Sequence, residues 1–152
     1  MKKNGLIFEV LGNDSEYCSQ ATALFEAVLP NSPKFNSAKE SSLEEIVYFA
    51  GFLDGNFCAS ALLIKEDDKF FIKKITVGQE FQGKGIGSML LRFCEEFAAE
   101  NEVRVIYSCV RDSIGRSAVN FFTKNEYFCA EEEVVEDGFF CKMMWKMLEL
   151  GS

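Results

Sequence analysis

The chain has 152 residues, a net charge of −8 and no histidine. With 48% hydrophobic residues, 26% charged residues and only two prolines, it cannot be a disordered or collagenous chain, and we expect a single domain over residues 1–152. The acidic balance also argues against nucleic acid as a partner, because a protein that binds the phosphate backbone needs a basic face.

Hydrophobic periodicity predicts seven strands along the chain. They cover Leu6–Leu11, Ile46–Leu53, Phe57–Ile64, Phe70–Val77, Val103–Val110, Phe128–Val135 and Phe139–Leu148. Asp54-Gly55 predicts a tight hairpin turn after the second strand, and the charged run Lys65–Asp68 predicts a turn after the third. These short connections make the second, third and fourth strands an antiparallel meander.

Three helices are expected between the strands. Polar residues at 13–15 can cap a helix that runs to about residue 29, and residues 30–42 are expected to form a loop. Apolar residues over Ile86–Ala98 recur at spacings of three and four, which predicts an amphipathic helix, and a short helix is expected over Arg116–Lys124. The order of elements predicts an α/β (α+β) fold with a mixed, mostly antiparallel central sheet of about seven strands flanked by helices.

The cysteines and the apolar runs indicate where the protein resides. Six cysteines are scattered without a C-x-x-C pair and lie mostly in apolar stretches, so we expect buried, reduced thiols in a cytoplasmic protein. Because histidine is absent, neither a metal site nor a Ser-His or Cys-His catalytic unit is expected. No apolar run approaches the roughly 20 residues of a membrane-spanning helix, so no membrane association is expected.

The stretch VGQEFQGKGIGSMLL, residues 77–91, joins the fourth strand to the second helix and has the composition of a phosphate-binding loop. A P-loop needs Ser or Thr after its lysine to hold magnesium, but Gly85 stands there. A dinucleotide fingerprint needs Gly or Ala where Ser88 stands, and it belongs in a parallel βαβ unit. The remaining alternatives are a metal-free pyrophosphate cradle, in which backbone amides and a helix N-terminus bind the anion, and a turn that needs its glycines for packing alone.

The motif Gln82-Gly83-Lys84-Gly85-Ile86-Gly87 resembles the Q/R-x-x-G-x-G/A loop of the GNAT-type N-acetyltransferases. The strand end Ile75-Thr76-Val77 is similar to the I/L-x-V that precedes this loop in the family, and the element order matches over nearly the whole chain. The resemblance implies that acetyl-CoA lies in a V-shaped opening between the strand before the loop and the following parallel strand. The acetyl-CoA contacts that it implies are Ile75, Thr76, Val77, Gln82, Gly83, Lys84, Gly85, Ile86, Gly87, Ser88 and Phe122.

Catalytic residues are less clear from the same resemblance. The family's later helix commonly carries a tyrosine that protonates the departing thiolate, and Phe122 occupies that position here; Glu126 occupies the position of a common glycine. Candidates for a substitute hydroxyl are Tyr107 and Ser108, although both suit ordinary strand positions. Glu80 is the carboxylate nearest the loop and the remaining candidate base, with a solvated loop charge as its simpler interpretation.

Two functions are therefore predicted. The first is an N-acetyltransferase that moves the acetyl group of acetyl-CoA to a primary amine of a small molecule or peptide by direct attack, without an acyl-enzyme. The alternative is a catalytically impaired acyl-CoA-binding sensor or interaction module. The net acidity mildly favours a cationic acceptor, and the resemblance makes a homodimer a further expectation.

Overall fold

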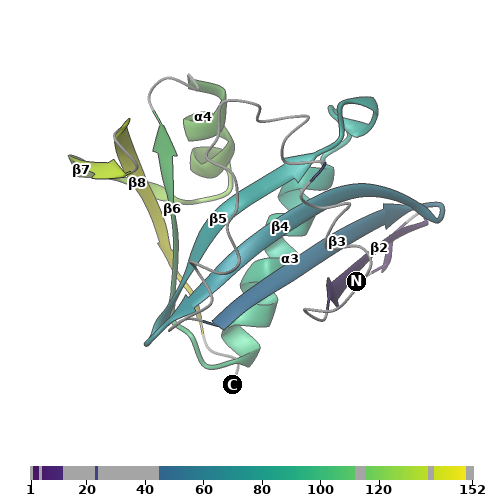
Figure 1. The fold of residues 1–152 in the computed structure, drawn as a ribbon, viewed down its shortest axis with the longest axis horizontal. Helices are drawn as coiled ribbons and strands as arrows, with labels where there is room; N and C mark the ends of the chain where they lie inside the picture. The colour runs from purple at the N-terminus through teal and green to yellow at the C-terminus, as the bar shows by residue number, and fades with distance from the viewer. Residues whose placement is uncertain are drawn as a thin grey trace.

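The computed structural model describes residues 2–3, 5–11, 23, 45–111, 116–136 and 139–149. The helix expected near residues 13–29 and the loop at 30–42 lie outside these ranges, apart from residue 23. The described strands form one sheet in the order β1-β2-β3-β4-β5-β6-β8-β7 (Figure 1).

All seven predicted strands are present, and a two-residue strand precedes them. The strands are β1 Lys2–Lys3, β2 Leu6–Leu11, β3 Glu45–Leu53, β4 Asn56–Glu66, β5 Lys69–Val77, β6 Val105–Arg111, β7 Phe128–Glu136 and β8 Phe139–Met147. The described helices are the 3₁₀ turn η1 Gln79–Phe81, α3 Ile86–Glu100 and α4 Arg116–Lys124. Among the described strands, β5 and β6 pair in parallel and every other neighbouring pair is antiparallel, so the predicted mixed sheet is confirmed.

The meander β3–β4–β5 follows its predicted turns with one correction. Asp54 and Gly55 both have positive φ, at 50° and 85°, as a two-residue hairpin turn requires. The prediction of a turn over Lys65–Asp68 was too long, because Lys65 and Glu66 remain in β4 and pair with β5. The cross-strand hydrogen bonds thus continue until only Asp67 and Asp68 are left for the turn.

The core lies between the sheet and α3, and phenylalanine dominates it. Phe49 on β3 contacts Phe93 and Phe97 of α3 edge-on, with ring centroids 5.8 and 5.2 Å apart, and Phe70 on β5 lies 5.9 Å from Phe97. The predicted apolar stripe of α3 faces this core, and the neighbouring Leu91, which the stripe did not include, is also fully buried. Edge-to-face aromatic packing therefore fixes α3 against the middle of the sheet.

A bulge interrupts β5 near its middle. Leu62 of β4 pairs with Lys74, but the next residue, Leu63, pairs with Ile72, so the register between the two strands skips Lys73. A bulge bends its strand and increases the local twist. The half of β5 that follows Lys73 therefore turns away from the direction of the half that precedes it.

The bulge coincides with the point where β5 and β6 separate. Their parallel pairing begins at Lys69 and ends at the pair Ile72–Ser108, although β5 continues to Val77 and β6 to Arg111. Beyond Ile72 the two strands diverge, and α4 lies near their open end (Figure 1). The result is a fork in the sheet, closed at Ile72–Ser108.

Glu126, in the turn between α4 and β7, has a left-handed backbone with φ 72°. This is the position at which the resembling family commonly has glycine, and the backbone explains the preference. A residue with a Cβ in this conformation costs roughly 1–2 kcal/mol.

We therefore predict that Glu126→Gly is more stable than Glu126→Ala by about 1 kcal/mol, which thermal unfolding would detect as about 2–4 °C in a domain of this size. Both variants lose the long contact of 3.9 Å between Glu126 and Lys146, so their comparison isolates the backbone. Equal stability of the two variants would contradict the assignment of strain to this residue.

Candidate functional site

At the open end of the fork, one edge of β5 is not paired with β6 among the described residues. Residues 74–77 pair with β4 on one side, but the described part of β6 pairs with none of them. Backbone N–H and C=O groups on that edge resemble those of a sheet edge, which accepts an added extended chain. The predicted V-shaped opening between these two strands is therefore present in the fold.

The glycine loop is attached to the open arm of the fork by two hydrogen bonds. The Gly78 amide donates to the Cys58 carbonyl on β4 at 2.8 Å, which extends the β4–β5 pairing by one residue. The Gln82 side-chain amide donates to the Val77 carbonyl at 3.0 Å and so ties the end of the loop to the end of β5. The motif glutamine thus holds the loop in place.

Two glycines shape the loop before α3 begins. Gly83 and Gly85 have φ of +81° and +79°, and a Cβ on either would meet nothing within 4 Å. Their requirement for glycine is therefore conformational, and the space beside them is open. The exposed Lys84 lies between them.

The N-terminus of α3 has the features of an anion-binding site. Its first helical hydrogen bond runs from the Met89 amide to the Gly85 carbonyl at 3.2 Å, and the N-cap residue Gly85 gives no side-chain hydrogen bond. Among the described residues, the amides of Ile86, Gly87 and Ser88 therefore have no acceptor. Amides of this kind, with the helix dipole behind them, bind phosphate without a metal ion.

Gly87 has a different function, which is close packing. A Cβ at this position would lie 3.3 Å from the Phe121 ring and 3.5 Å from a methyl group of Val77. Phe121 of α4 and Val77 at the end of β5 therefore both lie close to Gly87 at the start of α3. Sequence analysis did not select Phe121, since its spacing in the helix reads as an ordinary core position.

Phe122 is buried, with 4% of its surface exposed, and its ring contacts Phe121 and Tyr127 edge-on at centroid distances of 5.2 and 5.1 Å. The Tyr127 hydroxyl donates to a Glu95 carboxylate oxygen at 2.8 Å. Burial raises the pKa of Tyr127 well above its usual range, and the charge and hydrogen bond of Glu95 raise it further. Tyr127 is therefore committed to a structural hydrogen bond. A contact between Phe122 and acetyl-CoA stays a prediction.

The three other candidates occupy distinct places. Tyr107 lies at the closed part of the fork, where its hydroxyl donates to Glu66 at 2.5 Å and its ring stacks on Phe71 at 5.0 Å. Ser108 is buried and donates to the Ile72 carbonyl at 2.9 Å, so it fastens the last pair before the strands separate. Glu80 is exposed on η1. The fold thus brings only Ser108 to the base of the fork.

On the sheet face opposite α3, β5 carries buried polar residues. After the bulge, Ile75 and Val77 contact the core under α3, while Lys74 and Thr76 alternate to the other face and are 6% and 3% exposed. Thr76 lies opposite Ser60 of β4. In the described part of the chain, the Thr76 hydroxyl is the buried side-chain oxygen that lacks a hydrogen-bond partner. An unsatisfied buried hydroxyl beside the fork is a candidate ligand contact.

Burial disfavours the thiolate form of two cysteines. Burial raises the pKa of Cys94 well above its usual value, with a further increase from the Glu95 charge, and burial likewise raises the pKa of Cys58. The described residues contain no cluster of three or more metal-ligating side chains. None of the described helices is long and apolar enough to cross a membrane.

Comparison with known proteins places this geometry in a family. Residues 16–127 match the model of the acetyltransferase (GNAT) family. These residues include the fork, the glycine loop, α3 and α4. No curated protein sequence matches the chain.

Solved structures share the fold at low sequence identity. A GNAT family acetyltransferase from Elizabethkingia anophelis, with acetyl-CoA bound, has a TM-score of 0.72 and 17% identity, over 97% of this chain and 100% of its own. A Bacillus subtilis acetyltransferase in complex with CoA has a TM-score of 0.69 and 18% identity, over 95% and 99%. The ribosomal-protein-S18-alanine N-acetyltransferase from Escherichia coli has a TM-score of 0.72 and 15% identity, over 96% and 97%.

Ser108→Ala tests whether the Ser108 hydroxyl closes the fork. We expect a loss of about 1–2 kcal/mol, because the buried Ile72 carbonyl loses its side-chain donor, and faster amide hydrogen exchange in β5 and β6 next to the fork. Ser60→Ala is the matched control, since Ser60 makes a similar buried bond to the Phe49 carbonyl at 2.8 Å away from β6. Exchange near the fork that is equal in the two variants would contradict the assigned role.

Proposed function

Because the chain belongs to the acetyltransferase (GNAT) family, we propose that it transfers the acetyl group of acetyl-CoA to a primary amine of a small molecule or peptide. The observation that carries the proposal is the uncapped start of α3, which follows Gly83 and Gly85 at the open end of the β5–β6 fork. The helix amides that suit a phosphate and the strand edge that suits an extended chain lie at the same end of the fork. CoA has both groups, a pyrophosphate and an extended pantetheine arm.

The residues present fit CoA in two respects. The amides of Ile86, Gly87 and Ser88 suit the pyrophosphate, with the open space beside Gly83 and Gly85 for its approach. The free edge of β5 near residues 75–77 suits the amide groups of the pantetheine arm, which pair like an added strand. Lys84, exposed between the two glycines, adds a positive charge close to the pyrophosphate. When bound, acetyl-CoA supplies the thioester that the amine attacks.

Direct attack by the amine is favoured over an acyl-enzyme. Burial raises the pKa of both Cys58 and Cys94 and so disfavours the thiolate form that a nucleophile needs. The chain also has no histidine to activate a serine or cysteine. The protein would then accelerate transfer chiefly by holding the amine and the thioester in a reactive orientation.

Protonation of the leaving thiolate does not require a side-chain acid. Phe122 has no proton to give, and the Tyr127 hydroxyl is engaged in a hydrogen bond to Glu95. A thiol has a pKa of about 8.5, so its thiolate is a tolerable leaving group that water can protonate. Loss of a positioned acid typically costs about 10²–10⁴ in rate, so we expect slow but real turnover.

The acceptor would approach from the face of β5 that carries Lys74 and Thr76, opposite the core under α3. The Thr76 hydroxyl, buried without a partner among the described residues, is the group on this face that we propose to contact the acceptor or the thioester. The net charge of −8 favours a cationic amine overall.

The direct test is incubation with acetyl-CoA and a panel of amines, with free thiol as the readout. We expect turnover that Gly85→Asp abolishes, because the variant puts a negative charge at the pyrophosphate and a side chain where φ is +79°. Gly55→Asp is the matched control: Gly55 has φ +85° and open space too, but lies in the β3–β4 turn. Equal activity of the two variants would contradict the proposed site. Tight CoA binding without turnover on any amine would instead support the sensor alternative.

Phe122→Tyr tests the missing acid. If residue 122 lies at the leaving thiolate, as the family resemblance implies, the added hydroxyl holds or raises the turnover number at neutral pH while the Kd for CoA stays within about twofold. Phe121→Tyr is the control at the adjacent ring. A large fall in turnover with intact CoA affinity would show instead that Phe122 shapes the acceptor site.

A further inference from the structure

Four aromatic side chains form one row across the sheet, next to the closed end of the fork. Phe71 of β5 pairs in register with Tyr107 of β6, and their rings stack with centroids 5.0 Å apart. Trp145 of β8 pairs with Tyr107 on one side and with Phe128 of β7 on the other, and the Phe128 and Trp145 rings lie 4.3 Å apart. Because register partners point to the same face of a sheet, these four residues form a continuous aromatic row.

The aromatic row lies on the face of the sheet opposite α3. Side chains alternate between the two faces along a strand. The residues that precede the first three members of the row are buried in the core under α3; they are Phe70, Ile106 and Met144. The row therefore occupies the same face as Thr76, from which we propose that the acceptor approaches.

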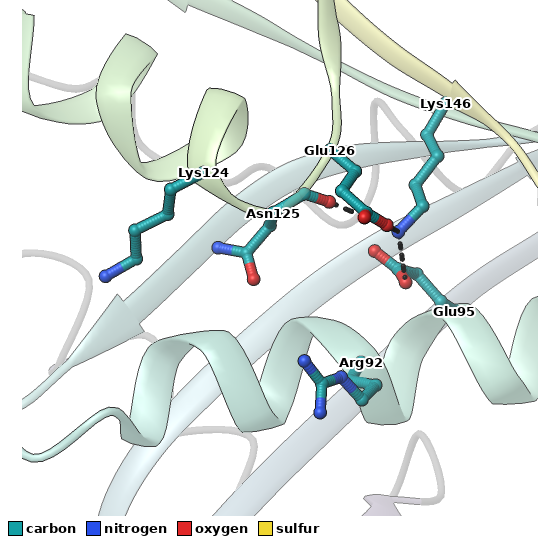
Figure 2. A pocket seen from close by; sticks show the side chains of 6 residues that line it. All are labelled: Arg92, Glu95, Lys124, Asn125, Glu126 and Lys146. Atoms are coloured by element: carbon teal, nitrogen blue, oxygen red, sulfur yellow. Dashed lines mark hydrogen bonds and ion pairs between the residues drawn. The ribbon is translucent and has the colours of Figure 1, made fainter.

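The reverse side of β8 is fixed by an ion pair. Lys146, the residue after Trp145, lies 3.0 Å from a Glu95 oxygen of α3 and donates to the Asn125 carbonyl at 3.2 Å (Figure 2). It lines a polar pocket of about 190 Å³ with Arg92, Glu95, Lys124, Asn125 and Glu126. The polar groups of β8 thus face α3, and Trp145 on the other face rests on a strand that is held in place.

The row is accessible, most of all at the edge of the sheet. Phe71, Tyr107 and Trp145 are half-buried, and Phe128 on the edge strand is 48% exposed. Met147, two residues after Trp145 and on the same face, is 60% exposed. Single exposed apolar side chains need no explanation, but a contiguous apolar surface marks a binding site.

Charge and length restrict what can bind to the row. The Lys69 ammonium lies 5.6 Å from the centre of the Tyr107 ring, and the Lys73 ammonium lies 5.8 Å from that of Phe71. A cationic group on these rings would meet like charges, so the row suits apolar groups. From β5 to β7 it spans three strand spacings, or roughly 14 Å. An extended peptide of about four residues covers this length, whereas a small amine does not.

We propose that the aromatic row binds the residues that follow the reacting amino group of a peptide acceptor, and that these residues are apolar. The inference rests on the proposed function, because it places the amino group at the fork. The fork closes at the pair Ile72–Ser108, which adjoins Phe71 and Tyr107. A peptide whose amino group lies there reaches Trp145 and Phe128 with its next residues.

The kinetic experiment compares peptide amides that share an N-terminal alanine, with acetyl-CoA as donor and free thiol as readout. We expect kcat/KM for Ala-Phe-Phe-Phe amide to exceed that for Ala-Ser-Ser-Ser amide at least about tenfold, because several aromatic contacts add up. The shorter Ala-Phe amide should keep only part of this gain, since it leaves the outer half of the row empty.

Phe128→Leu removes the outermost ring and keeps an apolar side chain. It should raise KM for the phenylalanine tetrapeptide about 2- to 10-fold, the effect of one aromatic contact, while kcat and the KM for Ala-Phe amide stay unchanged. Val135→Ala is the matched control, because Val135 is 66% exposed on the same strand but lies outside the row.

Fluorescence gives a readout that does not depend on turnover. Trp145 is the only tryptophan in the chain, so its emission reports the row directly. With CoA in place of acetyl-CoA, we expect the phenylalanine tetrapeptide to change this emission saturably. The serine tetrapeptide should leave it unchanged at the same concentration.

The outcomes separate the two proposals. Turnover with equal kcat/KM for the two tetrapeptides and unchanged Trp145 emission would overturn the peptide site and leave the proposed acetyltransferase activity intact. Equal kcat/KM for Ala-Phe amide and the phenylalanine tetrapeptide would also overturn it. A dimer that Phe128→Asp converts to monomers in sedimentation would assign the row to a second copy of the chain instead. Absence of turnover on every amine would overturn the proposed function, and peptide-dependent emission would then assign the row to a bound peptide that is not an acceptor.

Discussion

The separation of β5 from β6 at Ile72–Ser108 is the constraint on which the rest of the site depends. β5 has to remain paired with β4 as far as Val77, and the bulge at Lys73 bends it while it does so. β6 cannot follow that bend and still pair with β8, which it does along its whole length. One edge of β5 is therefore left with backbone groups that the strands of the fold do not satisfy, and such groups favour a bound chain or water. The binding edge that we propose on β5 therefore results from the pairing of β5 with β4 and of β6 with β8.

The position of the glycine loop is set by the strands and the helix at its two ends. Its two ends are set by β4, through the Cys58 carbonyl, and by α3, whose buried Leu90 and Leu91 anchor the helix under the sheet. Between these points the chain needs positive φ at Gly83 and Gly85, immediately before α3 begins. The anion that we propose to bind at this helix end would meet donors that are already in place, so that little ordering free energy would be lost on binding. The proposed pyrophosphate cradle therefore depends on β4, β5 and α3 together.

Much of this could be predicted from the sequence because the signals are local. Alternating apolar residues, Asp54-Gly55 and the apolar stripe from Ile86 gave the strands, the hairpin and α3 within a few residues. The bulge could not be predicted, since Lys73 is a lysine like its neighbour Lys74. Only the strand register on both sides of Lys73 reveals the bulge. The polar pocket was equally hidden, because its residues come from α3, the end of α4 and β8 and meet only in the folded chain. The strain at Glu126 had a partial signal, the glycine common at that position in the family.

The same distinction explains why the donor of the reaction can be inferred from the backbone, whereas the acceptor depends on side chains. The features proposed for CoA are backbone features: helix amides, a strand edge and glycines whose φ is positive. Backbone geometry survives extensive sequence change, as the TM-score of 0.72 at 17% identity to an acetyl-CoA-bound acetyltransferase illustrates. The acceptor would instead meet side chains such as Lys74 and Thr76 on the opposite face of β5. Side-chain recognition changes with single substitutions, because a buried polar group rejects any ligand that leaves it unpaired. Acceptor specificity in this fold is therefore set by the residues that relatives are least expected to share.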